Sequence, residues 1–245
     1  MKKLIILPVL LMVTTVFSQR ISPDKIDDIS IHPITHGTLA LEWNNKVIYV
    51  DPFGGGAKFE GLKAPDIILI TDIHGDHLNP ATLKAIETSK ATFVVPQAVA
   101  DRLPGEFKKT LVVINNGEKK DIQNINIEAI PMYNLPEDET SRHTKGRGNG
   151  YVVKLGKNRI YLSGDTEDIP EMRALKNIDI AFVCMNLPFT MNVEQAADAV
   201  LDFKPKIVYP YHYRGRPNIS DTQAFKKLVN DKNKKIEVRL RNWYQ

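Results

Sequence analysis

The sequence has few of the features that mark disulfide-stabilised or nucleic-acid-binding proteins. Cys184 is the only cysteine among 245 residues, so no disulfide can form within the chain. It lies in the apolar run 178–185, which predicts a buried thiol and a poor nucleophile. The formal net charge is only +4, and no basic run is interleaved with aromatic residues, which argues against a nucleic-acid partner. The basic segment 232–241 is typical of a solvated face.

Long hydrophobic runs are also missing, except at the N-terminus. Lys2 and Lys3 precede an apolar run over 4–17, and Ser18 ends a short cleavage-site pattern, so residues 1–19 are predicted to be a secretory signal peptide. The run is shorter than the roughly 20 apolar residues of a membrane span, and an uncleaved N-terminal anchor is the alternative. We therefore expect an exported protein, periplasmic or secreted, with no stable membrane span after cleavage. Without the two lysines its formal net charge is +2.

What the sequence does have is one dense group of metal-binding residue types. Asp72, His74, Asp76 and His77 follow the apolar run 67–70, which is typical of a short buried strand. Side chains two residues apart in an extended segment point the same way, so Asp72 and His74 can converge on one ion. Asp76 and His77 follow the bend at Gly75 and can face a second ion. Carboxylate oxygen and imidazole nitrogen together favour zinc, iron or manganese over calcium.

Three further candidates follow predicted strands or lie in a loop. Asp165 comes directly after an apolar strand and a glycine, from which it can reach a site, although it can also cap the next helix. His212 follows the strand 206–209 in the same way. His143 lies in the polar loop 134–149 and, taken alone, is equally well a surface histidine.

Strand and helix patterns alternate along the chain and predict a single α+β domain over 20–245. After an extended lead-in at 20–28, strands are expected at 29–34, 38–43, 46–50, 67–70, 91–95, 110–114, 121–122, 125–130, 151–155, 159–163, 178–185, 206–209 and 235–240. Helices are expected at about 80–88, 97–103, 170–172, 193–203 and 220–230. Each half offers strands followed by helices, a pattern that fits two packed β-sheets with helices outside.

Several of these segments together resemble one family. Residues 71–78 are similar to the His-x-His-x-Asp-His signature of the metallo-β-lactamase superfamily, with Asp72 in place of the first histidine. The segments 36–38, 51–52, 146–151, 164–166, 186–191 and 210–213 resemble further motifs of that superfamily, and of its branch of ascorbate-6-phosphate lactonase-like hydrolases. The resemblance implies a four-layer αββα sandwich.

The resemblance also assigns roles. It implies a first metal ion on Asp72, His74 and His143, a second on Asp76, His77 and His212, and Asp165 as the bridge between them. Asp76 would help to orient a hydroxide formed between the ions, so Asp76 and Asp165 are the expected catalytic residues. His36 and Asp51 should lie beside the site, with Asp51 orienting a ligand.

The ions are expected to be two divalent metals, zinc first, with manganese or iron as alternatives. Asp72 departs from the signature and adds negative charge at the first ion. We therefore expect a weaker Lewis acid there and a preference for harder metals, while a single-ion site also stays open.

The function that follows is hydrolysis of a lactone or other ester, a phosphodiester or an amide in a small-molecule substrate. The alternative is a non-catalytic, metal-stabilised binding protein of the same fold. Expected substrate contacts, chosen by position, are Tyr133, Asn186, Tyr213 and Arg214. Basic residues near the histidines suit an anionic substrate, although solvated loop charges explain them as well: Arg142, Lys145, Arg147, Arg214 and Arg216. The oligomeric state stays open.

Overall fold

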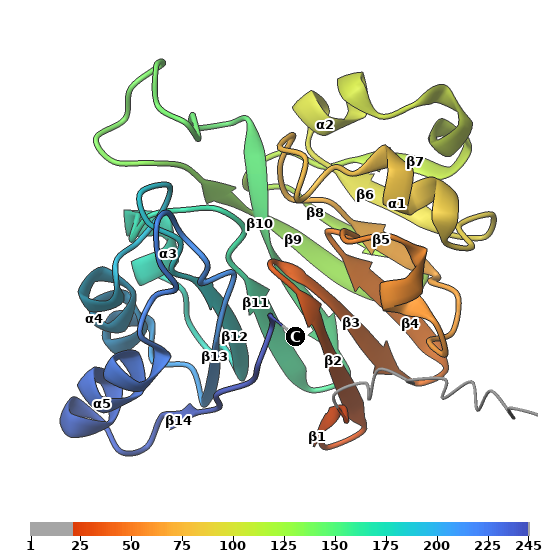
Figure 1. Cartoon of the computed structure of the whole chain (residues 1–245). Helices are drawn as coiled ribbons and strands as arrows, with labels where there is room; N and C mark the ends of the chain where they lie inside the picture. The colour runs from red at the N-terminus through yellow and green to blue at the C-terminus, as the bar shows by residue number, and fades with distance from the viewer. Residues whose placement is uncertain (1–21, 245) are drawn as a thin grey trace, which may run out of the picture.

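The computed structural model describes residues 22–244, and the predicted signal peptide at 1–19 lies outside them. Two seven-stranded sheets pack face to face, and helices cover the outer face of each sheet (Figure 1). The predicted four-layer α+β sandwich is therefore confirmed. Within the described part of the chain, every helix is too short or too polar to cross a membrane.

The first sheet uses the strands in chain order. They are β1 (Asp24–Ile26), β2 (Ile29–Thr35), β3 (Thr38–Trp43), β4 (Lys46–Val50), β5 (Ile67–Leu69), β6 (Thr92–Val95) and β7 (Leu111–Val113). Strands β1 to β4 are antiparallel, because short turns such as Asn44-Asn45 connect them. Strands β4 to β7 are parallel, and α1 (Pro80–Ala85) and α2 (Gln97–Arg102) lie in the crossovers.

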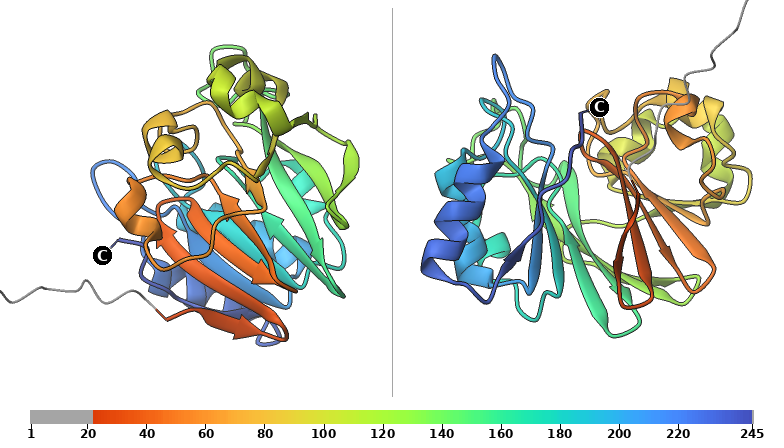
Figure 2. Two further views of the ribbon diagram at one scale, coloured as in Figure 1. Left: turned by 90° about the vertical axis from the view of Figure 1, so that its right-hand side faces the viewer. Right: turned by 60° about the horizontal axis from the view of Figure 1, so that its bottom comes forward.

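The second sheet repeats this plan. Its strands are β8 (Lys119–Ile122), β9 (Ile125–Met132), β10 (Gly148–Leu155), β11 (Asn158–Leu162), β12 (Ile180–Cys184), β13 (Ile207–Tyr211) and β14 (Glu237–Val238). Strands β8 to β11 are antiparallel and β11 to β14 parallel. The crossovers contain α3 (Pro170–Arg173), α4 (Val193–Phe203) and α5 (Thr222–Lys232), which cover the outer face (Figure 2). Two 3-10 helices, Gly56–Phe59 and Gly105–Thr110, complete the described elements.

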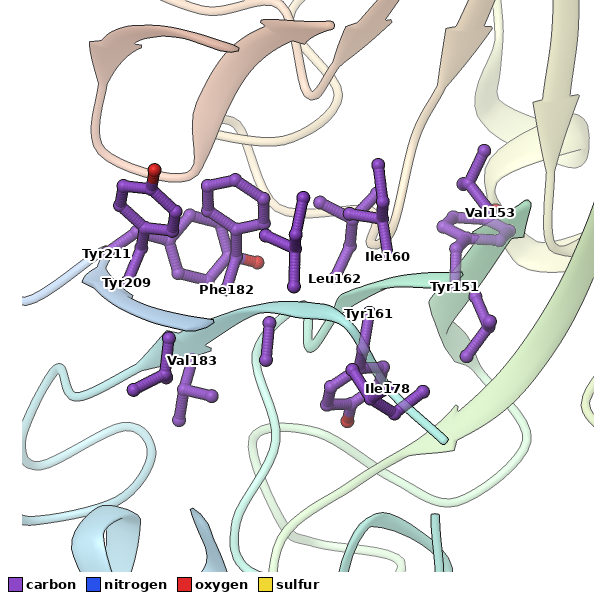
Figure 3. Packing of buried hydrophobic residues seen from close by; sticks show 14 of the residues in the cluster. Tyr151, Val153, Ile160, Tyr161, Leu162, Ile178, Phe182, Val183, Tyr209 and Tyr211 are labelled. Carbon is purple, nitrogen blue, oxygen red and sulfur yellow. The ribbon is translucent and has the colours of Figure 1, made fainter. Parts of the chain in front are cut away.

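The main core lies between the sheets and follows the alternation of side chains along each strand. Phe182 and Tyr209 stack with ring centroids 5.0 Å apart and point toward the first sheet, as does Leu162, whereas Tyr161 and Val183 point toward the helices (Figure 3). All five side chains are fully buried. Each such side chain stabilises the fold by roughly 1.5–3 kcal/mol relative to an exposed one, so this layer fixes how the two sheets face each other.

Some elements are shorter than predicted. Helix α1 ends at Ala85 instead of 88, because Ile86 already has an extended backbone (φ −112°, ψ 155°). The strand expected at 235–240 is reduced to two residues, since β14 is the edge strand and pairs with β13 alone. The last helix begins two residues later than expected, at Thr222, because the carboxylate of Asp221 accepts from the backbone N–H groups of Gln223 and Ala224 and caps it.

Candidate metal centre

The loop after β5 has a fixed shape. The backbone N–H groups of His77 and Leu78 donate to the carbonyl of His74, which forms a tight turn. Asn79 caps α1 by accepting from Thr82 N at 2.9 Å, and its amide donates to Gly75 O at 2.9 Å. The turn and the cap together determine the directions in which the side chains of this loop point.

All seven predicted metal ligands come together, from loops at one edge of the sandwich. In the first cluster, Asp72 Oδ2 lies 2.6 Å from His74 Nδ1 and 3.9 Å from His143 Nε2. In the second, His212 Nε2 lies 3.3 Å from Asp76 Oδ2. The first grouping, Asp72, His74 and His143, is the ligand set that the resemblance implied, and its donor atoms lie close enough to hold one ion. His212 instead groups with His77 and Asp165, and separately with His36 and Asp76, so the implied second set of Asp76, His77 and His212 stays a prediction.

Asp165 lies between the clusters. Its Oδ2 atom is 3.4 Å from His143 Nε2 in the first cluster and 3.4 Å from His77 Nε2 in the second. Its Oδ1 atom is 3.4 Å from His212 Nε2. One buried carboxylate therefore faces both clusters, which is the position expected of a bridging group.

Five atoms that face the centre of this site have no hydrogen-bond partner among residues 22–244. They are buried and include His74 Nδ1, His77 Nε2, His143 Nε2, His212 Nε2 and Asp165 Oδ1. The 2.6 Å approach of His74 to Asp72 also lacks the direction of a hydrogen bond. Buried polar atoms in proteins are almost always paired, so five unpaired ones in these two clusters indicate that cations bind there. The chemistry of the donors, imidazole and carboxylate, fits a divalent transition metal.

The pKa values of the site residues also favour a bound cation. Burial raises the pKa of Asp165, but His212 and His77 outweigh it and hold that pKa well below the usual range. Burial likewise raises the pKa of Asp72, and His74 and other nearby cations more than offset this. Burial lowers the pKa of His77, yet Asp165 and Asp51 raise it well above normal. The carboxylates thus stay ionised at neutral pH and present a concentrated negative charge for a cation.

Asp51 contacts the ring nitrogen of His77 that faces away from the site. The Oδ2 atom of Asp51 lies 2.8 Å from His77 Nδ1, and Oδ1 accepts from Thr71 N at 2.7 Å. The Thr71 hydroxyl donates to Asp51 Oδ2 at 2.6 Å. This arrangement directs the Nε2 atom of His77 toward the site, where a metal ion would take the place of its proton, and Asp51 lies beside the site as the resemblance implied.

His143 has a matching partner, Asn134, which sequence reasoning missed. The Oδ1 atom of Asn134 accepts from His143 N at 2.8 Å and lies 3.0 Å from His143 Nδ1. The carbonyl of His143 in turn accepts from Asn134 N at 2.9 Å. The only signal in the sequence was the position of Asn134 at the start of the loop that contains the histidine.

His36 lies on the other side of His212. Its carbonyl accepts from His212 N at 3.1 Å, and its ring contacts the rings of His212 and Tyr244. Burial, followed by the nearby His212, lowers the pKa of His36 to about 4, so the ring is neutral at pH 7. A Cβ on the adjacent Gly37 would lie 3.3 Å from His212 Cδ2, so this close approach favours glycine.

Residues 30–212 match the family model described as "Beta-lactamase superfamily domain". The chain belongs to the metallo-β-lactamase superfamily. Within it, the chain is 33% identical over 214 residues to a UPF0173 metal-dependent hydrolase of Pyrococcus abyssi, an alignment that covers 83% of this chain and 93% of the relative.

Solved structures of the superfamily agree with this fold. A protein of Parabacteroides distasonis described as a metal-dependent hydrolase is 38% identical, with a TM-score of 0.75 over 89% of this chain and 94% of the other. A metallo hydrolase from Ignicoccus hospitalis has the same TM-score at 21% identity, and it covers 89% of this chain and 96% of its own. The second likeness supports the fold alone.

The departure from the superfamily signature, Asp72, has a partner of its own. Arg147 Nε donates to Asp72 Oδ1 at 3.2 Å and Arg147 Nη2 donates to Oδ2 at 3.1 Å. Asp72 is fully buried and the Arg147 side chain is 19% exposed. Arg147 is therefore not a solvated loop charge, since its charge is paired inside the site, and its contact with an anionic substrate stays a prediction.

Two of the predicted substrate contacts have protein partners. The Tyr133 hydroxyl donates to Glu171 at 2.9 Å. Asn186 Oδ1 accepts from the Thr190 hydroxyl at 2.5 Å, and both residues are buried. These bonds fix the orientation of both side chains, and contact of either one with substrate stays a prediction.

The other two predicted substrate contacts, Tyr213 and Arg214, lie beside the C-terminal segment. The Tyr213 hydroxyl donates to Arg241 O at 3.0 Å and accepts from Trp243 N at 3.2 Å. The exposed Arg214 places its guanidinium 4.3 Å from the ring centroid of Tyr244. Substrate contact stays a prediction for both, and the structure adds Tyr244 as a neighbour of the site that the sequence did not suggest.

The remaining basic residues divide into two kinds. Lys145 is paired with Glu137 at 2.8 Å and with Glu171 at 3.2 Å, so its charge is largely neutralised. Within residues 22–244, no carboxylate lies within ion-pair distance of the exposed arginines Arg142, Arg214 and Arg216. Arg142 and Arg216 lie over the Phe189 ring, at 4.4 and 5.8 Å from its centroid.

Proposed function

We propose that this metal-dependent hydrolase holds two divalent ions, zinc in the first instance, and cleaves a lactone or other ester, a phosphodiester or an amide in a small anionic substrate. The position of Asp165 carries the proposal, because one buried carboxylate faces both clusters at 3.4 Å. Manganese and iron are the alternative metals. Bound divalent ions supply Lewis acidity and lower the pKa of water to about 7.

The protein's own residues hold and orient the reacting groups. His74 and His143, with Asp72, would hold the first ion, and His77 and His212, with Asp76, the second. Asp76 is one-third exposed, unlike the fully buried Asp72, so it lies at the entrance of the site where water and substrate arrive. Its burial raises its pKa, but His77 and His212 lower that pKa below the normal range, so it accepts hydrogen bonds as a carboxylate. Asp76 thus serves to orient the attacking water.

The proposal of an anionic substrate depends on three arginines that have no carboxylate partner within residues 22–244. Arg142, Arg214 and Arg216 lie on loops that also contain or follow His143 and His212. Contacts with the Phe189 and Tyr244 rings orient the three guanidinium groups without neutralising them. An anion bound to them would place its neighbouring ester or amide bond beside the two clusters. We also propose that the mature chain, beginning at Arg20, is exported, as the N-terminal pattern favours.

Hydrolysis assays on the purified mature chain test the function. The substrates are carboxylic esters, lactones, bis-nitrophenyl phosphate and amides, each assayed with chelator and then with zinc, manganese or iron(II) restored. We expect turnover of at least one class, lost with chelator and regained with metal. Metal bound at about two ions per chain without turnover of any class would favour the rival function, a metal-stabilised binding protein.

A further inference from the structure

We propose that Arg147 is a positioning residue for the first metal ion, and that Asp72 and Arg147 together replace the neutral histidine of the superfamily signature. The proposal rests on the two-ion site of the proposed function. The guanidinium would hold Asp72 in its ligating orientation and cancel the charge that this carboxylate adds. The first ion would then experience the same net ligand charge as it does beside a histidine.

The geometry allows Asp72 to bind Arg147 and an ion at once. The guanidinium takes one hydrogen bond to each carboxylate oxygen, at 3.2 and 3.1 Å. A carboxylate oxygen has a second lone pair, and Oδ2 also faces His74 Nδ1 at 2.6 Å and His143 Nε2 at 3.9 Å. Ligating carboxylates are commonly held by a hydrogen bond of this kind.

The unpaired imidazoles argue that Arg147 does not take the place of the ion. His74 Nδ1 and His143 Nε2 are buried and have no hydrogen-bond partner among the described residues. Arg147 donates to Asp72 and to neither imidazole. A guanidinium that replaced the ion would have to satisfy these two nitrogens. Because they stay unsatisfied, the space between them and Asp72 still needs a cation.

The fold brings the two residues together from 75 positions apart. Asn149 N donates to Thr71 O at 2.9 Å, so the start of β10 lies against the residue that precedes Asp72. A Cβ on Gly148 would lie 2.9 Å from Thr71 O, so a larger residue there would push β10 away. Arg147 directly precedes this contact, and its side chain is therefore directed at Asp72.

The test compares metal binding in the wild type, Asp72→His, Arg147→Met and the double variant. Each protein is loaded with zinc and desalted to remove unbound metal. Mass spectrometry then gives the number of bound ions, and titration with a competing chelator gives their affinity. We expect about two ions in the wild type. In Asp72→His the guanidinium is left unpaired beside the first ion, so we expect that ion to bind at least about tenfold more weakly. The double variant removes that repulsion and should regain about two ions.

Three comparisons make the result specific. Asp72→His/Arg142→Met removes a neighbouring loop arginine that stacks on Phe189, and it should not regain the ion. Arg147→Met should keep the ion, because removing a cation does not repel metal, but the cobalt(II) absorption spectrum of the first site should change as Asp72 loses its orientation. If Asp72→His fails to fold by circular dichroism, Asp72→Asn leaves the same unpaired guanidinium and gives the same comparison.

Two outcomes would overturn the proposal. One is a wild type with a single ion and an Arg147→Met variant with two, since the guanidinium would then exclude the ion. The other is full retention of the first ion in Asp72→His, since Arg147 would then be uncoupled from the site. In both cases the protein still binds metal and the proposed hydrolysis survives. A wild type without any bound metal would instead overturn the proposed function.

Discussion

Asp51 Oδ2 and His77 Nδ1 lie 2.8 Å apart in the floor of the site, and both side chains are fully buried. Asp51 directly follows β4, and His77 lies in the turn after β5, the strand that pairs in parallel with β4. The backbone N–H of Thr71 holds the second oxygen of Asp51 at 2.7 Å. The carboxylate is therefore fixed before any metal arrives, and it selects which nitrogen of His77 faces the site.

The first prediction follows from this pair. Asp51→Asn should weaken binding of the second ion by about 10–100-fold, because an amide cannot both accept from Thr71 and stabilise the ligating form of His77. A chelator titration of the zinc-loaded protein measures the change. Asp231→Asn, on the exposed face of α5, is the matched control and should bind metal like the wild type. Equal affinity in the two variants would show that Asp51 has no influence on the ligand.

The second prediction concerns Asp165, whose carboxylate lies between the two clusters. Asp165→Ala removes the one carboxylate that faces both clusters, so the metal content should fall from about two ions per chain to one or fewer. Metal analysis of protein purified with added zinc gives the count, and Asp231→Ala controls for loss of a surface acid. If Asp165→Ala retains both ions, the two clusters are independent sites.

Much of this site could be predicted because its residues follow recognisable strands. Asp72, His74, Asp165 and His212 each come after a short apolar run, and parallel strands end at a common edge of their sheet. His143 was different, since a histidine in a polar loop has no local signal and only the resemblance to the superfamily indicated it. The two-sheet fold followed from the alternating patterns, whereas the exact ends of α1 and β14 depended on neighbouring elements.

The pairing of Arg147 with Asp72 could not be predicted. It spans 75 residues and depends on how the start of β10 lies against Thr71, a contact that no local pattern encodes. Asn134 was missed for the same reason, because its role depends on a loop that returns nine residues later. Sequence patterns identify residue types at strand ends, but they do not identify which distant side chain supports each one.

The third prediction concerns Cys184. Burial, followed by the nearby Asp165, raises the pKa of this thiol from 9.0 to about 11. Because the folded pKa is the higher one, the stabilising effect of the neutral thiol is complete below pH 9 and is lost as the pH rises toward 11. Native protein at pH 8 should therefore resist iodoacetamide, and unfolded protein should take up one equivalent. Rapid alkylation of the native chain would contradict the buried position.

The fourth prediction concerns Gly37. Gly37→Ala introduces a Cβ 3.3 Å from His212 Cδ2, so the His212 ring must shift, whereas the 3.7 Å distance to His77 Cε1 is an ordinary contact. We expect weaker metal binding with little loss of secondary structure, measured by chelator titration and circular dichroism. Gly105→Ala, where a Cβ would meet no atom within 4 Å, is the matched control. Unchanged affinity in Gly37→Ala would mean that His212 can move without cost.

The last prediction tests how substrate is recognised. Arg214 is exposed, has no carboxylate partner within residues 22–244, and is held over Tyr244 at 4.3 Å, two positions after His212. On an anionic substrate found in the hydrolysis screen, Arg214→Ala should raise KM about tenfold or more and change kcat little, because the lost contact binds a part of the substrate that does not react. Arg102→Ala, an exposed arginine of α2, is the control. Added salt should reduce the difference between Arg214→Ala and the wild type, since screening weakens exposed charges. A KM unchanged by Arg214→Ala would remove this arginine from the substrate site and leave Arg142 and Arg216 as the remaining candidates.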